Sequence, residues 1–158
     1  MRRGVFAGLV AAAATGGVLL GFGSARGAPW RLINSAAVIA FGNSARFHHD
    51  FNVTVTAVGL AVHVLSVLLW GVVFAIATWR LRGWLLSLAG ILFAGIVYVI
   101  DILLLPTRIA PGFESALTTP ELAVVFATLG ISLAAGVALA GGRNEQSGTV
   151  DEFGHVSH

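Results

Sequence analysis

Four long apolar stretches, separated by short polar segments, constrain the fold of this chain more than any other feature. They cover residues 4–22, 53–78, 84–105 and 121–140. A helix needs about 20 mostly apolar residues to cross the hydrocarbon core of a bilayer, and each stretch is close to that length. Backbone groups inside a bilayer must be hydrogen-bonded within their own segment, so we expect each stretch to be a transmembrane α-helix.

The composition supports a membrane location for these helices. Of the 158 residues, 57% are hydrophobic and 10% are charged, whereas a soluble domain normally carries about 25% charged residues. A chain of this length cannot bury so much apolar surface in one core, so the remainder must face lipid. The sequence therefore predicts an all-α membrane protein, with one domain at residues 1–142 that forms a small bundle of four transmembrane helices.

Two segments outside the apolar stretches have their own patterns. Residues 29–42 begin with Pro29 and are apolar but too short to span, so they are predicted to form a short interfacial helix after the first span. Residues 143–158 are polar and contain Gly and Ser, which predicts a disordered tail.

The last apolar stretch has clear end signals. Thr119, Pro120 and Glu121 are predicted to be the N-cap, the first helical residue and the acidic first turn. Gly141 and Gly142 are predicted to end this helix.

The charged residues indicate an orientation and argue against nucleic-acid binding. All nine basic residues are arginines, and they occur in ones and twos rather than as a nucleic-acid-binding patch. With abundant Ala and Gly, this arginine usage is typical of a GC-rich bacterial genome. The side that holds both termini in a four-span topology would carry these arginines: Arg2, Arg3, Arg80, Arg82 and Arg143. The other side would carry four arginines: Arg26, Arg31, Arg46 and Arg108. Because positive charges beside the first span and in a short turn weigh most in the positive-inside rule, we expect both termini in the cytoplasm and the helices in a bacterial inner membrane.

The first apolar stretch has two interpretations. Small residues recur every four positions at Gly4, Gly8, Ala12 and Gly16, and such rows let helix backbones approach closely in lipid. We therefore expect this face to pack against another helix, and a second small row follows at Ala13, Gly17 and Gly21. The alternative is a cleaved signal peptide that ends near residue 25.

His63 lies well inside the second apolar stretch and belongs to a stripe of polar and small residues on one helix face. Thr56, Gly59, His63, Ser66 and Trp70 fall at helical spacing on one face. A transmembrane histidine can be a cofactor ligand such as a haem ligand, a proton relay or a quinone donor. It can also simply hydrogen-bond a neighbouring helix. A haem held by two histidines would need a second copy of the chain, and the sequence predicts no cofactor.

Asp101 is the acidic residue within the third stretch, close to its end. A carboxylate is costly in hydrocarbon, so we expect its side chain to point into the bundle. Its predicted partner is Arg108 or one of His48 and His49, in a structural or a proton-relay role. Tyr98 lies three residues earlier and is expected on the same helix face.

Metal and thiol chemistry have little support in the sequence. His48, His49 and Asp50 are adjacent possible metal ligands, but no HExxH or similar spaced motif occurs. The chain has no cysteine, which excludes disulfides, thiolate catalysis and Cys-ligated metals.

One longer pattern carries a resemblance. It consists of Asp101, Pro106, Arg108 and residues 111–114, preceded by His63, Ser66, Trp70 and Gly71. This pattern resembles one in small bacterial multi-pass membrane proteins of uncharacterised function. It covers residues 59–117. The resemblance implies that the third span and its exit loop form a recurring unit, and it implies no activity.

Three classes of function follow, in decreasing order of support. The absence of a catalytic motif and the small extramembrane parts favour a non-enzymatic accessory or self-associating subunit, with the lipid bilayer and other subunits or copies as partners. His63 and Asp101 favour a small oligomeric transporter or channel. The histidines and aspartates together would suit a membrane redox or metal-binding protein. The sequence leans against an enzyme.

Overall fold

The computed structural model describes residues 1–106 and 116–152 of the chain, and the side chains up to residue 141. It is all-helical, with 82% helix and no strand in the described residues. Four helices are long and apolar enough to cross a membrane, and they cover Arg2–Ala25, Val53–Ala77, Trp84–Leu104 and Thr119–Gly141. The predicted fold class, a small all-α bundle of four membrane-length helices, is confirmed.

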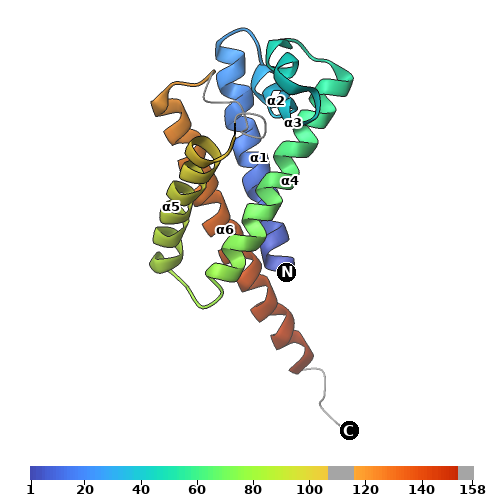
Figure 1. Cartoon of the computed structure of the whole chain (residues 1–158). Coiled ribbons are helices and arrows are strands. Elements are labelled where there is room, and N and C mark those ends of the chain that lie inside the picture. Colours follow the sequence, from blue (N-terminus) through green and yellow to red (C-terminus); the bar gives the residue numbers. More distant parts are fainter. Residues whose placement is uncertain (107–115, 153–158) are drawn as a thin grey trace.

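The four long helices alternate in direction. α1 (Arg2–Ala25) and α6 (Thr119–Glu152) form the centre, with α4 (Val53–Ala77) packed on α1 and α5 (Trp84–Tyr98) packed on α6. The start of α1, the turn between α4 and α5, and the lower part of α6 lie at one end of the bundle (Figure 1). This end carries Arg2, Arg3, Arg80 and Arg82, and we call it the arginine end. The opposite end holds the segment between α1 and α4 and is called the α2 end.

Small residues explain why α1 can occupy the centre. A Cβ added to Gly8 would lie 2.8 Å from the Leu68 Cα, and one on Gly71 of α4 would lie 2.6 Å from the Gly8 Cα. On its other side α1 meets α6, where a Cβ on Gly136 would lie 2.5 Å from the Ala7 Cα. Backbones this close gain dispersion energy along their whole contact, which drives helix association in lipid.

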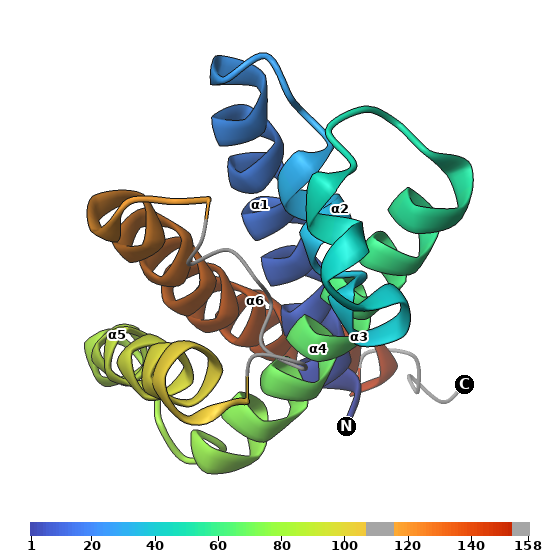
Figure 2. The ribbon, with the colours of Figure 1, turned by 45° about the horizontal axis from the view of Figure 1, so that its top comes forward.

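Three short helices connect α1 to α4 at the α2 end. They are α2 (Arg31–Ser35), α3 (Val38–Phe41) and the 3₁₀ helix η1 (Gly42–Phe47). The views in Figures 1 and 2 place α2 and α3 beside α1 and α4. Residues 32–38 of this segment are all buried. A Cβ on Gly59 of α4 would lie 2.2 Å from the Ile33 carbonyl oxygen, so α2 rests directly on the α4 backbone.

The third span does not end as a regular α-helix. Its last turn, η2 (Val99–Leu104), is a π-helix, closed by a 2.9 Å bond from the Leu105 N–H to the Ile100 carbonyl. Leu105 is then extended, as expected for a residue before proline. The sequence pattern predicted the extent of this helix but not its wider last turn, which contains Asp101.

The ends of α6 differ from those predicted. The Thr118 N–H donates to Glu121 Oε2 at 2.8 Å. In a capping box, this is the bond from the backbone N–H of the N-cap residue to the acidic side chain three residues later. The N-cap is therefore Thr118 and not Thr119, one residue earlier than expected. At the other end, α6 continues as a helix through Gly141 and Gly142 to Glu152, beyond the end predicted at these glycines. The predicted disorder of residues 143–158 stays a prediction.

Candidate functional site

A cavity of about 290 Å³ lies in the half of the bundle nearer the α2 end. We call it the His63 cavity. Its polar lining residues come from three elements far apart in the chain: Thr15 of α1, His63, Ser66 and Trp70 of α4, and Asp101 of η2. Its apolar walls include Val125, Phe126 and Leu129 of α6. A mostly apolar cavity with a few convergent polar groups is the usual form of a small-molecule site.

The arrangement of α4 and α5 leaves room for this cavity. These helices follow one another in the chain, yet α5 packs on α6 rather than on α4. Aromatic side chains bridge the space between them: Phe93 of α5 lies 5.9 Å from Trp70 and 5.1 Å from Phe74, measured between ring centroids. Phe74 has no exposed surface. We call Trp70, Phe74 and Phe93 the aromatic group; on α4, Phe74 lies one turn beyond Trp70 toward the arginine end.

His63 is held in place by α1. Its side chain is 7% exposed, and its Nε2 lies 3.1 Å from the Ala12 carbonyl oxygen and 3.3 Å from Thr15 Oγ1. The Thr15 hydroxyl donates to the Ala11 carbonyl at 2.7 Å, so its oxygen is an acceptor toward the histidine. Since a carbonyl can only accept, Nε2 carries the proton of the neutral ring. Nδ1 is then an acceptor, and it makes no hydrogen bond to any described residue.

Gly16 of α1 lies beside this ring. A Cβ added to Gly16 would lie 3.5 Å from His63 Nε2, which is an ordinary contact distance. The row of Gly4, Gly8, Ala12 and Gly16 is buried throughout. Its first two members face the α4 backbone, whereas Ala12 supplies the carbonyl that binds His63 and Gly16 faces the ring. The same stripe thus packs two helices and positions the histidine.

Asp101 lines the same cavity from the opposite wall. The Trp70 indole, whose N–H can only donate, interacts with the Asp101 carboxyl group. The predicted partnership of Asp101 with Arg108, or with His48 or His49, stays a prediction. Arg108 lies outside the described residues.

The remaining candidate residues lie elsewhere. The side chains of His48, His49 and Asp50 are exposed at the α2 end. No group of three His, Asp or Glu side chains able to hold a metal ion occurs among the described residues. Tyr98 packs edge-on against Phe126 of α6, with ring centroids 5.2 Å apart. Its aromatic ring therefore joins α5 to α6.

Two polar groupings escaped the sequence analysis. Asn34 is fully buried, donates to the His48 and Asp50 carbonyls at 2.9 and 3.0 Å, and accepts from the Thr56 hydroxyl at 2.8 Å. The presence of the polar residue Asn34 inside the apolar segment 29–42 could have indicated this network.

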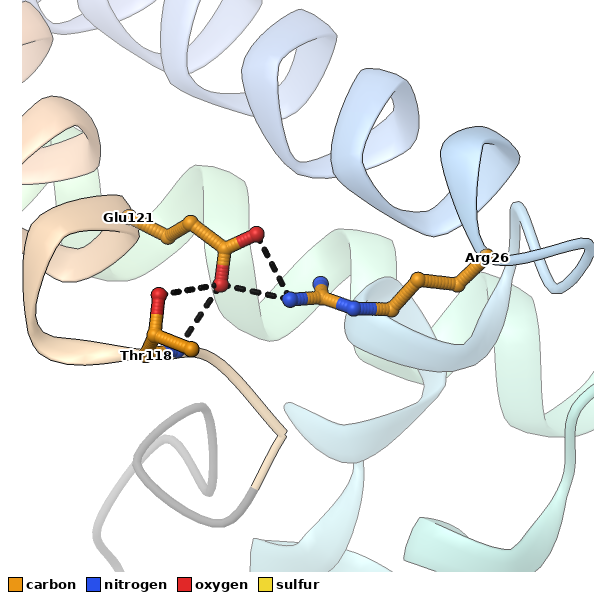
Figure 3. Close-up of polar contacts among 3 residues, drawn as sticks. All are labelled: Arg26, Thr118 and Glu121. Carbon is orange, nitrogen blue, oxygen red and sulfur yellow. Dashed lines mark hydrogen bonds and ion pairs between the residues drawn. The ribbon is translucent and has the colours of Figure 1, made fainter.

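The second grouping joins the ends of α1 and α6. Arg26 Nη2 contacts both carboxylate oxygens of Glu121, with 2.6 Å to Oε1 (Figure 3). The Thr118 hydroxyl donates to the same carboxylate at 2.7 Å. Arg26 and Glu121 are 95 residues apart, so no local sequence pattern indicated their pairing.

The chemistry available in the His63 cavity is hydrogen bonding and proton exchange. It offers a carboxyl group, one free imidazole acceptor and hydroxyl groups, in surroundings that are otherwise apolar. Such a cavity suits a small polar solute or a proton. Neither a protein-family model, nor a curated protein sequence, nor a solved structure matches this chain. The functional argument therefore depends on this geometry.

Proposed function

We propose that this protein is a small multi-pass membrane transporter or channel in which His63 and Asp101 bind a proton or a small polar solute. One observation carries the proposal: the ionisable residues inside two different membrane-length helices line the same cavity. Ionisable side chains are costly within a membrane, and where they occur they commonly mark solute paths or proton relays. This placement supports transport over the accessory role that the sequence alone favours.

The aromatic group supports the same proposal. A transport protein must keep its binding site closed toward one side of the membrane while the site is accessible from the other. Trp70 lines the His63 cavity, and Phe74, which packs on Phe93, lies one turn of α4 closer to the arginine end. They form an apolar barrier of the kind that gates narrow pathways.

The location proposed for the protein is a bacterial inner membrane. The arginine end holds Arg2, Arg3, Arg80 and Arg82 close to helix ends, and the positive-inside rule assigns such an end to the cytoplasm. The His63 cavity would then lie in the outer half of the membrane.

Proton flux through reconstituted vesicles tests the proposal. Vesicles that contain the protein should dissipate an imposed pH gradient faster than empty vesicles, as reported by a pH-sensitive dye trapped inside. Asp101→Asn should reduce this flux by at least about tenfold, because general acid–base groups contribute factors of this size or larger. Asp50→Asn removes an exposed carboxylate outside the cavity and should leave the flux unchanged. Equal flux for the wild type and Asp101→Asn, or no flux above empty vesicles, contradicts a proton pathway.

A self-associating or accessory subunit is the second candidate. The row of Ala13, Gly17 and Gly21 on α1 is exposed, and a Cβ on either glycine would meet nothing within 4 Å. Outward-facing small residues at this spacing suit a contact with another membrane helix. A redox or metal-binding role has no comparable support among the described residues.

The oligomeric state in mild detergent tests this second candidate. Gly17→Leu together with Gly21→Leu should lower the number of copies per particle, because the larger side chains keep a partner helix at a distance. Gly95→Leu is the matched control, since Gly95 also faces open space but on α5. If light scattering gives the same mass for the double variant, the control and the wild type, the α1 row is not an association surface.

A further inference from the structure

A second cavity, of about 670 Å³, lies at the arginine end. We call it the Arg82 cavity. It is bounded by the start of α1, the last turns of α4, the turn that leads into α5, and α6 near Gly141. Among the described residues, it shares no lining residue with the His63 cavity. A molecule bound in the Arg82 cavity would therefore occupy a site distinct from the one proposed for transport.

The lining of the Arg82 cavity is cationic in one part and apolar in another. Arg3 and Arg82 are the charged residues among its described lining, and no acidic side chain is among them. The walls deeper along α4 and α6 are apolar, with Val72, Ile76 and Val137. A cavity that is cationic at the membrane surface and apolar below it matches a molecule with an anionic head and a hydrocarbon tail.

The two arginines are placed to bind the head of such a molecule. The Arg3 guanidinium lies over α6, with its Cζ 4.0 Å from the position of a Cβ on Gly141. Neither Arg3 nor Arg82 forms a salt bridge with a described residue. Guanidinium groups bind phosphate oxygens through several hydrogen bonds at once.

The neighbouring side chains place this cavity at the membrane surface. Trp79 lines it with 68% of its surface exposed, and exposed tryptophans are typical of the headgroup region. Arg80 stacks on Trp79, 4.4 Å from the ring centroid, and does not line the cavity. Arg80 thus has the same charge and nearly the same depth as Arg82 without access to the cavity.

We infer that the Arg82 cavity is a binding site for an anionic phospholipid, with the phosphate held by Arg3 and Arg82 and one acyl chain lying along Val72, Ile76 and Val137. Basic pockets between membrane helices on the cytoplasmic side bind anionic headgroups in this way. The apolar walls set this cavity apart from a site for a free anion.

Native mass spectrometry of the full chain in neutral detergent tests this inference. Phosphatidylglycerol and phosphatidylcholine with identical acyl chains are added in separate titrations. Phosphatidylglycerol should bind with higher affinity and with one copy per chain. Arg3→Gln combined with Arg82→Gln should weaken its binding roughly 25-fold, since each juxtamembrane arginine contributes about a fivefold factor. Arg80→Gln should change the affinity less than about threefold, because that guanidinium lies outside the cavity.

Two further measurements separate the head from the tail. Ala138→Trp should fill the apolar wall and weaken phosphatidylglycerol binding while both arginines remain; Ala138 is an exposed residue of the lining, so the fold should tolerate the change. Inorganic phosphate alone should compete poorly.

Four results would overturn the lipid site. They are equal binding of the two lipids, unchanged binding in the double arginine variant, an equally large loss with Arg80→Gln, or complete competition by inorganic phosphate. The last would identify an anion site without a lipid tail.

Discussion

Asn34 is the single residue on which the α2 end most depends. Its amide donates to two backbone carbonyls from the segment before α4 and accepts from the Thr56 hydroxyl. Asn52, which caps α4 through the Val55 N–H at 3.0 Å, also donates its backbone N–H to the Thr56 hydroxyl oxygen at 3.1 Å. One buried side chain thus ties α2 to the start of α4.

Asn34→Ala should therefore destabilise the protein. The substitution leaves two carbonyls and one hydroxyl without this partner, and each unpaired buried group costs about 1–3 kcal/mol. We expect a fall in apparent melting temperature, measured by circular dichroism in detergent. Asn43→Ala is the control, because Asn43 is exposed in η1. Similar melting temperatures for both variants would show that the Asn34 network contributes little.

At the residue scale, the sequence predicted part of the candidate site. His63, Ser66 and Trp70 share one face of α4 by helical spacing alone, and all three line the cavity. The position of Asp101 in the same cavity was not predictable from spacing, because it depends on contacts between different helices. It depends on how α4 and α5 lie across the bundle and on the wider π turn of η2.

At the scale of elements, the tight packing of α1 explains the order of the helices. Its small residues let α4 and α6 approach on two sides, and α5 then packs on α6, where a Cβ on Gly90 would lie 2.5 Å from the Gly130 carbonyl oxygen. The short turn after α4 is accommodated by Gly83, whose φ of 60° is favourable for glycine. Small residues in the sequence indicated close contacts but not which helices would form them.

Two matched alanine substitutions on α1 test this packing. Gly8→Ala should lower the melting temperature in detergent, because the added Cβ would lie 2.8 Å from the Leu68 backbone and force the helices apart. Gly17→Ala adds the same methyl group where nothing lies within 4 Å, and it keeps a small residue in the outward row. We expect it to leave stability unchanged or to raise it, since alanine favours helix by about 1 kcal/mol over glycine. A Gly8→Ala variant as stable as Gly17→Ala would contradict close α1–α4 packing.

At the scale of the whole molecule, apolar stretch length alone predicted the four-helix bundle. Each predicted span matches one of the membrane-length helices to within three residues at either end, because 20 apolar residues in lipid have few other structures available. The arrangement around the bundle was not predictable from the same pattern, since hydrophobic residues face both lipid and protein. The two cavities follow from that arrangement.

Chemical modification of the His63 cavity tests the central claim most directly, namely that this cavity is the path of the transported proton or solute. The chain has no cysteine, so Ser66→Cys introduces a single thiol into the cavity lining. Modification by a thiosulfonate reagent, followed by mass spectrometry, should abolish proton flux in vesicles in proportion to the labelled fraction. Ser44→Cys carries an exposed thiol in η1, outside the cavity lining, and its labelling should leave flux unchanged. Full flux through completely labelled Ser66→Cys would contradict the account.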